Sequence, residues 1–233
     1  MKRVLSKFII ASGLALGCSV LTFAHAADVS EVPDAEKGEQ LYVKGDMSRG
    51  VLACVTCHGE AGNSTQDIHP SLAAMPYEYI VKQMHDFVPQ GDKPAKRRGK
   101  DGAPSTMAAI AGPLTDEDIR NISYYLSLQP LDWETAAQAV DNESLNRGRV
   151  IWRGGIMDRG VAACAACHGA DGAGIPGEFP RLAGQHIPYL VEQLKLFRSG
   201  DRDNSAMMHD LADRMNDKDI EAVANFAAGL RRK

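Results

Sequence analysis

Residues 50–59 read Gly-Val-Leu-Ala-Cys-Val-Thr-Cys-His-Gly, and residues 160–169 read Gly-Val-Ala-Ala-Cys-Ala-Ala-Cys-His-Gly. The second stretch repeats the first at an offset of 110 positions. The same offset aligns further glycine, proline and aromatic residues: Gly38 with Gly148, Pro70 with Pro180, and Phe87 with Phe197. An internal repeat of this length predicts two similar domains of about 100 residues each.

Each repeat contains the motif Cys-x-x-Cys-His, which is the signature for covalent haem attachment. The spacing places both thiols on one side of a helical turn, where they can form thioether bonds with a haem, and the histidine supplies an imidazole for the iron. A zinc site shared by the two cysteine pairs is the alternative, but each pair has its own histidine and its own repeat. We therefore predict two covalently bound haem c groups, attached through Cys54, Cys57, Cys164 and Cys167, with His58 and His168 as iron ligands.

The second axial ligands are predicted from the repeat. Beyond Phe197 the offset falls to 101, and it then aligns Met107 with Met208. Methionine opposite histidine is a common ligand pair in cytochromes c, and it raises the reduction potential. Met207 and His209 flank Met208 and stay as alternatives for the second haem. Four other methionines suit the ordinary role of core filler: Met75, Met84, Met157 and Met215.

Pro70 and Pro180 each follow their motif histidine by twelve residues. A proline offers a rigid turn and a carbonyl, to which a ligating imidazole donates its other ring N–H. We predict this supporting role for both prolines, although an ordinary loop proline is the alternative. Among the other histidines, His69 aligns with Phe179 and is predicted to line the first haem pocket. His85 and His186 are predicted to lie on the surface.

The fall in offset means that the first repeat carries about nine extra residues between Phe87 and Met107. This insert holds five basic residues within positions 93–100: Lys93, Lys96, Arg97, Arg98 and Lys100. Such a loop can attract an acidic partner and speed the encounter. A solvated flexible loop is the alternative interpretation, and the sequence leaves both open.

Residues 1–26 have the features of a secretory signal peptide. Lys2, Arg3 and Lys7 precede an apolar run over positions 8–23, and Ala-His-Ala at 24–26 fits a cleavage site. Cys18 falls inside the segment that would be removed. A retained membrane anchor is the alternative, but the run is short for a span, which needs about 20 residues.

Composition sets limits on function. The chain has 233 residues, of which 44% are hydrophobic and 24% charged, as in ordinary soluble proteins. Only 6% are aromatic, so a large apolar cofactor would help to fill two small cores. Removing the three cations of the signal peptide takes the net charge from −4 to about −7, which argues against a nucleic-acid partner.

The patterning predicts an all-α fold. Apolar residues at helical spacing predict helices over 35–43, 77–87 and 119–128, with counterparts at 144–152, 188–197 and from 216 onward. We predict a first domain at 27–129, a linker at 130–145 and a second domain at 146–233. The linker contains Pro130 and four acidic residues, and a short helix is possible over 134–140.

The chain resembles the dihaem cytochrome c4 family, which is built from two class I cytochrome c domains. The resemblance covers nearly all of the chain after residue 26. It is strongest in the second repeat, at Gly154-Gly155, at positions 163–169, at Phe-Pro-Arg-Leu-Ala-Gly-Gln-His over 179–186 and in the helix 216–226. The first repeat lacks the Gly-Gln pair at 69–75, and its basic loop is its own.

The resemblance implies helical domains in which the first and last helices cross. The crossing would place Gly38 and Tyr42 against Tyr125 in the first domain. In the second, it would place Gly148 and Trp152 against Phe226.

The resemblance also implies a periplasmic protein, sometimes loosely membrane-associated, that passes electrons from a quinol-oxidising complex or dehydrogenase to a terminal oxidase. Each iron would cycle between Fe(III) and Fe(II). A dedicated electron-accepting subunit of one dehydrogenase is an alternative. A dihaem peroxidase or thiosulfate-oxidising enzyme is another, but it would need a labile iron ligand or an unusual one such as cysteine. Outside the signal peptide, every cysteine belongs to a haem motif.

Overall fold

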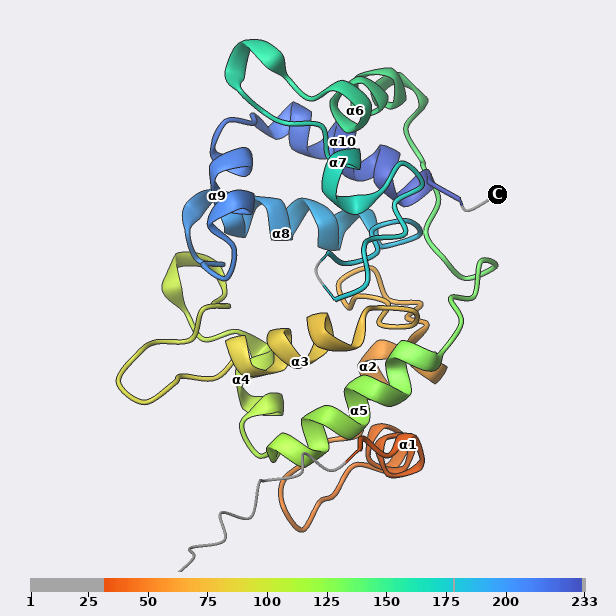
Figure 1. Cartoon of the computed structure of the whole chain (residues 1–233), viewed down its shortest axis with the longest axis vertical. Helices are drawn as coiled ribbons and strands as arrows, with labels where there is room; N and C mark the ends of the chain where they lie inside the picture. Colours follow the sequence, from red (N-terminus) through yellow and green to blue (C-terminus); the bar gives the residue numbers. More distant parts are fainter. Residues whose placement is uncertain (1–31, 178, 232–233) are drawn as a thin grey trace, which may run out of the picture. The chain divides into compact units, whose positions relative to one another are not determined.

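The computed structural model describes residues 32–177 and 179–231, and Figure 1 shows its helices. The predicted signal peptide at 1–26, including Cys18 and His25, lies outside the described residues. Regular secondary structure in the described part of the chain is helical, with isolated β-bridges but no strand, so the all-α prediction is confirmed. The two repeats pack together in one unit that spans residues 33–233.

Within the described residues, each repeat contributes five α-helices. The first half contains α1 (Ala35–Lys44), α2 (Val55–His58), α3 (Tyr77–Asp86), α4 (Thr106–Ala111) and α5 (Asp116–Leu128). The second half contains α6 (Asn142–Gly154), α7 (Ala165–His168), α8 (Ile187–Ser199), α9 (Ala206–Asp213) and α10 (Asp217–Gly229). Short 3₁₀ turns lie at Glu60–Gly62, Lys100–Gly102 and Met157–Arg159.

Local signals start the longer helices. Thr115 and Asn216 each form a capping box, in which the cap side chain and the aspartate three residues later exchange hydrogen bonds with the backbone. Asp34 and Asp141 cap α1 and α6 through their carboxylates. The predicted long helices therefore form close to where the sequence placed them.

The first and last helices of each half cross at a glycine. A Cβ atom on Gly38 of α1 would lie 2.1 Å from the carbonyl oxygen of Asn121, and one on Gly148 of α6 would lie 2.1 Å from that of Ala222. Only glycine allows helices to approach so closely. Next to each crossing, aromatic rings meet at centroid distances of 5.5 Å (Tyr42 with Tyr125) and 6.3 Å (Trp152 with Phe226). The predicted crossings are confirmed.

Each half has its own apolar core. Tyr42, Ile122 and Leu126 lie at the centre of the first core, and Ile151, Trp152 and Ile220 at that of the second. The prediction that four methionines fill the cores is confirmed for Met75, Met84 and Met215. It is wrong for Met157, which is 84% exposed because it begins the 3₁₀ turn of a tight surface loop.

The linker predicted at 130–145 has no helix over 134–140, so that expectation is wrong. Its backbone is instead bound to the rest of the molecule. The amide N–H of Ala137 donates to Gly184 O at 3.0 Å, and that of Val140 donates to Asn225 Oδ1 at 2.8 Å. These long-range bonds use backbone donors that a helix would have used locally, and they hold the linker against the second half.

No helix in the described part of the chain combines the length and the apolar character that a membrane span requires.

Candidate haem sites

Both cysteine motifs form a single helical turn. Cys54 immediately precedes α2, and its carbonyl accepts hydrogen bonds from the backbone N–H groups of Cys57 at 3.2 Å and His58 at 2.9 Å. Cys164 does the same for Cys167 and His168, at 3.3 and 3.0 Å. All four thiols are half-buried and free. Burial raises the pKa of Cys54 and Cys164 to about 11.

The motif histidines are buried and oriented by backbone carbonyls. Nδ1 of His58 lies 2.9 Å from Pro70 O, and Nδ1 of His168 lies 3.0 Å from Pro180 O. A carbonyl only accepts, so Nδ1 carries the proton and Nε2 keeps its lone pair for a metal. Burial lowers the pKa of both imidazoles, which favours the neutral, ligating form.

An aromatic ring stands beside each motif histidine. The His58 and His69 ring centroids are 6.0 Å apart, and those of His168 and Phe179 are 5.9 Å apart. His69 and Phe179 are repeat equivalents, so the two sites share this wall residue position.

The aligned methionines lie in the short helices α4 and α9. Ser105 and Ser205 cap these helices, and their hydroxyls accept from the N–H of Met107 and Met208, each at 3.3 Å. Met107 packs against the same apolar core as Cys54, and Met208 against the same core as Cys164. Sequence reasoning missed these two helices, although a serine two or three residues before each methionine is a capping signal.

The neighbours of Met208 are placed differently. Met207 is 52% exposed. Nδ1 of His209 lies 2.6 Å from Phe197 O, so this ring is engaged by α8. Met208 is the member of this trio that is partly buried against the core of the second half.

The residues present fit haem c. Each half offers two thiols from one turn, a buried imidazole with a free Nε2, and a thioether on the same apolar core. No group of three or more His, Cys, Asp or Glu side chains among the described residues is arranged to hold a metal ion, so no shared zinc site is present in that part of the chain.

The halves meet beside both motifs. Gln185 forms two hydrogen bonds with the backbone of Ser71, and Arg181 donates to Ala73 O at 3.0 Å. His186 was predicted to be a surface residue, and this is wrong, since it is only 3% exposed. Its Nε2 lies 3.0 Å from Ser64 O in the other half. His85 has a 41% exposed side chain, in agreement with its predicted surface position.

The basic loop at 93–100 differs from both expectations. Its backbone pairs with the second half through Arg98 N to Asp201 O at 2.9 Å and through Asp203 N to Lys96 O at 2.6 Å. Arg97 is buried and Arg98 half-buried, so the docking-patch prediction is wrong for these two cations, which face the other half.

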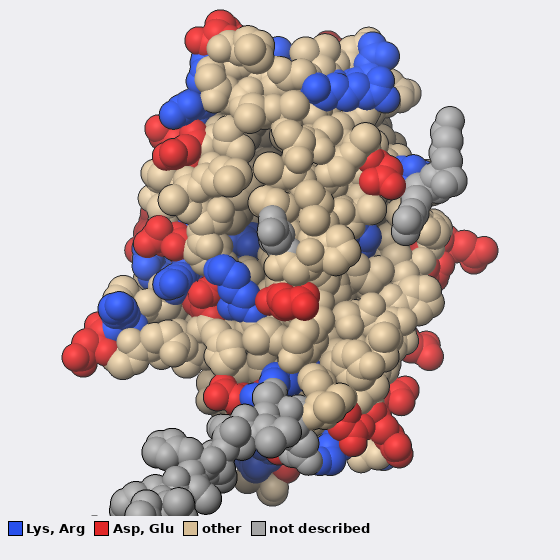
Figure 2. Space-filling view, in the orientation of Figure 1, with Lys and Arg blue, Asp and Glu red and all other residues tan. Residues whose placement is uncertain are grey.

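The three lysines of the loop, Lys93, Lys96 and Lys100, remain exposed. On the face drawn in Figure 2, lysine and arginine side chains are interspersed with acidic ones rather than gathered in one basic patch.

Comparison with known proteins agrees with this geometry. A family model described as cytochrome c matches residues 35–129 and 156–230. The chain is 37% identical over 213 residues to cytochrome c4 of Thiocapsa roseopersicina, a match that covers 90% of this chain and 99% of that protein. The chain belongs to the cytochrome c4 family. It therefore binds two haem c groups covalently, and it is an electron-transfer protein rather than an enzyme.

A crystal structure of reduced recombinant cytochrome c4 from Pseudomonas stutzeri superposes with a TM-score of 0.71 at 33% identity, covering 85% of this chain and 100% of that one. A thiosulfate dehydrogenase electron acceptor of Stutzerimonas stutzeri (strain A1501) is 32% identical over 203 residues, which cover 85% of this chain and 88% of that protein. Redox proteins are thus the class of partner for this dihaem carrier.

Proposed function

We propose that this cytochrome works in the periplasm and carries single electrons from a quinol-oxidising complex or a dehydrogenase to a terminal oxidase or another acceptor. The signal-peptide pattern at 1–26 supports the export. One observation carries the shuttle role: each half repeats the same set of two cysteines, one carbonyl-oriented histidine and one methionine on a shared apolar core. Such a set leaves no open iron position for a substrate.

In this proposal, His58 and Met107 would hold the iron of the first haem, and His168 and Met208 would hold that of the second. When bound, each haem supplies an Fe(III)/Fe(II) couple, and methionine ligation raises its potential. The chain's own contribution is positioning. Pro70 O holds the first imidazole and Pro180 O the second, so the ligands need little rearrangement during electron transfer.

The junction supports exchange of electrons between the two haems. Ser71 and Ala73 closely follow Pro70, whose carbonyl is the partner of His58. Across the junction, Ser71 N donates a hydrogen bond and Ala73 O accepts one. Arg181 and Gln185 closely follow Pro180, the partner of His168. The elements that orient the two imidazoles are therefore bonded to each other.

We propose domain limits of 27–129 and 146–233, with the linker at 130–145.

A dedicated acceptor of one dehydrogenase is the second candidate. The observation that favours it is the 32% identity with the thiosulfate dehydrogenase electron acceptor. The two candidates differ in their donors. A shuttle accepts electrons from a quinol-oxidising complex at a rate comparable to that from a dehydrogenase, whereas a dedicated subunit is reduced quickly by its own enzyme alone.

Spectra and rates test the proposal in sequence. Absorption spectra of the purified holoprotein, oxidised and reduced, are recorded with and without carbon monoxide. Two low-spin haems that do not bind carbon monoxide are expected, whereas a haem that binds it readily would contradict the closed ligand sets. Stopped-flow reduction by a quinol-oxidising complex and by a thiosulfate dehydrogenase then separates the shuttle from the dedicated acceptor.

A further inference from the structure

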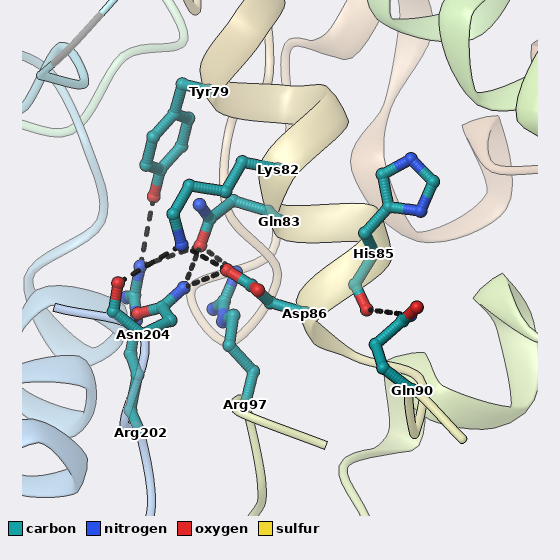
Figure 3. A network of polar contacts seen from close by, with 9 residues as sticks. All are labelled: Tyr79, Lys82, Gln83, His85, Asp86, Gln90, Arg97, Arg202 and Asn204. Carbon is teal, nitrogen blue, oxygen red and sulfur yellow. Dashed lines mark hydrogen bonds and ion pairs between the residues drawn. The ribbon is translucent and has the colours of Figure 1, made fainter. Parts of the chain in front are cut away.

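Two arginines lie buried at the junction between the halves, where they link residues of both repeats. Arg97, from the basic loop, is 7% exposed, and Arg202, which follows α8, is 6% exposed. Their backbones form an antiparallel bridge. Figure 3 shows the side chains around them, with Tyr79, Gln83 and Asp86 of α3 facing Arg202 and Asn204.

The hydrogen bonds of this arginine pair cross the junction in both directions. Arg97 donates to Gln83 Oε1 at 3.2 Å in its own half, and to Gln193 Oε1 at 2.9 Å and Tyr189 Oη at 3.3 Å in the other. Arg202 donates to Gln193 Oε1 at 2.8 Å in its own half. It also donates to Gln83 Oε1 at 3.0 Å and Tyr79 Oη at 3.2 Å across the junction.

Each guanidinium also stacks on an aromatic ring of the apolar core of its own half. Arg97 stacks over Phe87 with 4.2 Å to the ring centroid, and Arg202 over Phe197 with 4.3 Å. Phe87 belongs to the core that holds Cys54 and Met107. Phe197 belongs in the same way to the core of Cys164 and Met208. One cation therefore lies on the edge of each haem pocket, and each is bonded to the half that holds the other haem.

The charge of the pair is not balanced by a carboxylate among the described residues. The side-chain acceptors of Arg97 and Arg202 there are neutral amides and phenols, with Asn204 Oδ1 accepting from Arg202 at 3.1 Å. Asp86 is nearby, but its carboxylate bonds to Asn204 at 2.9 Å and pairs with Lys82. Arginine stays protonated in proteins, so two positive charges share this site.

The phenol of Tyr189 responds to these charges. Its burial raises the pKa, but the positive charges of Arg97 and Arg202 outweigh that effect and lower it below the usual value for tyrosine. Burying a cation costs free energy, and the hydrogen bonds from both guanidiniums to Gln83 and Gln193 offset part of that cost.

We propose that Arg97 and Arg202 form one shared cationic centre that raises the reduction potentials of both haems. Reduction of Fe(III) to Fe(II) removes one positive charge from a haem. A nearby buried cation repels the oxidised form more than the reduced form, and low dielectric and exclusion of water strengthen that repulsion. Because each cation touches both halves, neutralising either one shifts both couples.

The test uses the purified holoprotein and measures the midpoint potentials of both haems by spectroelectrochemical titration. Arg97→Gln and Arg202→Gln each remove one charge and keep hydrogen-bonding capacity. We expect both potentials to fall in each variant, with an equilibrium constant for reduction that drops severalfold and by up to about tenfold, or 59 mV for a one-electron couple.

Two further variants separate charge from structure. Arg98→Gln removes a neighbouring cation that also bridges the halves, through Gly200 O at 2.9 Å, but that contacts no aromatic ring of a haem core. Arg97→Lys keeps the charge and loses the planar fork of hydrogen bonds. We expect Arg98→Gln to shift the two midpoint potentials by only a small fraction of the shift caused by Arg97→Gln. Arg97→Lys should keep both potentials of the parent protein, although it lowers the urea midpoint of unfolding.

Three results would overturn the proposal. The first is unchanged potentials in both glutamine variants, and the second is a shift no larger than that of Arg98→Gln. The third is a shift confined to one haem in each variant, which would leave two independent cations rather than a shared centre. Should Arg97→Gln fail to accumulate, Arg202→Gln carries the same test. The inference uses the two haems but no partner, so its failure would leave the carrier role untouched.

Discussion

The side-chain amide of Gln185 forms hydrogen bonds with the backbone of Ser71 through both its oxygen and its nitrogen. Ser71 N donates to its Oε1 at 3.0 Å, and its Nε2 donates to Ser71 O at 2.9 Å. Both residues are buried. The glutamine belongs to the second repeat, whereas Ser71 follows the proline whose carbonyl holds His58. This pair therefore joins the second half to the element that orients the first haem ligand.

Replacing Gln185 with alanine should destabilise the whole protein. The change leaves a buried N–H and a buried C=O of Ser71 without partners, and we expect a loss of about 2–4 kcal/mol in the free energy of unfolding. Urea unfolding of the oxidised holoprotein, followed by circular dichroism, measures this loss. Gln66→Ala is the control, since exposed Gln66 bonds only within its own half, to Thr56 O at 3.2 Å. Equal effects of the two substitutions would contradict the prediction.

A pair of glycines in α6 offers a test of the helix crossing. Gly148→Ala places a Cβ 2.1 Å from Ala222 O, so the two helices must separate. We expect a cost of about 3 kcal/mol or more, which thermal unfolding would register as a large drop in Tm. Gly154, at the end of the same helix, has nothing within 4 Å of its added Cβ. Gly154→Ala should leave stability unchanged or raise it by about 0.5 kcal/mol.

The sequence predicted the elements that local signals determine. The helix predicted at 35–43 forms at Ala35–Lys44, and that predicted at 77–87 forms at Tyr77–Asp86. Helical periodicity and capping residues are encoded within a few positions of each other, so they can be read without the fold. The haem motifs are equally local, because four residues suffice to place two thiols and an imidazole on one turn.

Features that depend on partners distant in the chain could not be predicted. The linker has residues suited to a helix over 134–140, but two of its backbone N–H groups donate instead to Gly184 O and to Asn225 Oδ1 in the second half. His186 and Arg97 have the polarity of surface residues, but both are buried and each forms a hydrogen bond with an acceptor in the other half. No local pattern shows that a polar side chain will meet a partner more than 90 residues away.

The missing Gly-Gln pair of the first repeat has a structural explanation. Its equivalents are Ala74 and Met75. Ala74 adopts the same left-handed turn as Gly184, with φ of 54° against 70°. At Gly184 the linker approaches, and an added Cβ would lie 3.0 Å from Ala136 Cβ. The second repeat therefore needs glycine for the linker and glutamine for the junction, whereas the first repeat accepts alanine and a buried methionine.

Gly184→Ala should therefore destabilise the protein, by about 1–2 kcal/mol, through backbone strain together with crowding of the linker. Ala74→Gly is the matched change in the other half, where it relieves the same backbone strain at an exposed position. We expect it to leave stability within about 1 kcal/mol of the parent protein. Urea midpoints of the two variants measure the difference, and a larger loss for Ala74→Gly would be incompatible with this explanation.

The choice among Met207, Met208 and His209 can be made by spectroscopy. Met208→Ala should remove the weak long-wavelength absorption of one Met–Fe(III) bond, allow one reduced haem to bind carbon monoxide, and lower the potential of that haem. Met207→Ala changes an exposed side chain and should preserve all three properties. His209→Ala should preserve the absorption band and cost about 1 kcal/mol of stability, because its ring bonds to Phe197 O. If the absorption band is lost in the Met207→Ala or the His209→Ala variant and kept in the Met208→Ala variant, the substituted neighbour is the ligand instead of Met208.

Acid should weaken the second half through Asp219. Burial alone would raise the pKa of this carboxyl, but hydrogen bonds from Arg159 and Arg147, together with the backbone of Asn216, lower it below the ordinary value. A depressed folded-state pKa contributes stability that is fully present above the unfolded pKa of about 3.9 and is lost as pH falls through the folded value. The contribution of Asp219 is therefore present at neutral pH and disappears at strongly acidic pH.

Asp219→Asn isolates this contribution. We expect the variant to be less stable than the parent by about 1–2 kcal/mol at pH 7, since Arg147 and Arg159 lose a charged acceptor but remain partly exposed. The gap should narrow as pH falls below about 4, because the carboxyl of the unfolded parent then takes up a proton while that of the folded parent does so only at its lower pKa. Urea midpoints of both proteins at pH 7 and pH 3 measure the gap.

Asp217→Asn is the control. Its carboxylate is 57% exposed and paired with Arg198, so this substitution should give a smaller stability gap at pH 7, because water screens that pair. A gap for Asp219→Asn that stays constant with pH would show that the neutral side chain, and not its charge, stabilises the start of α10.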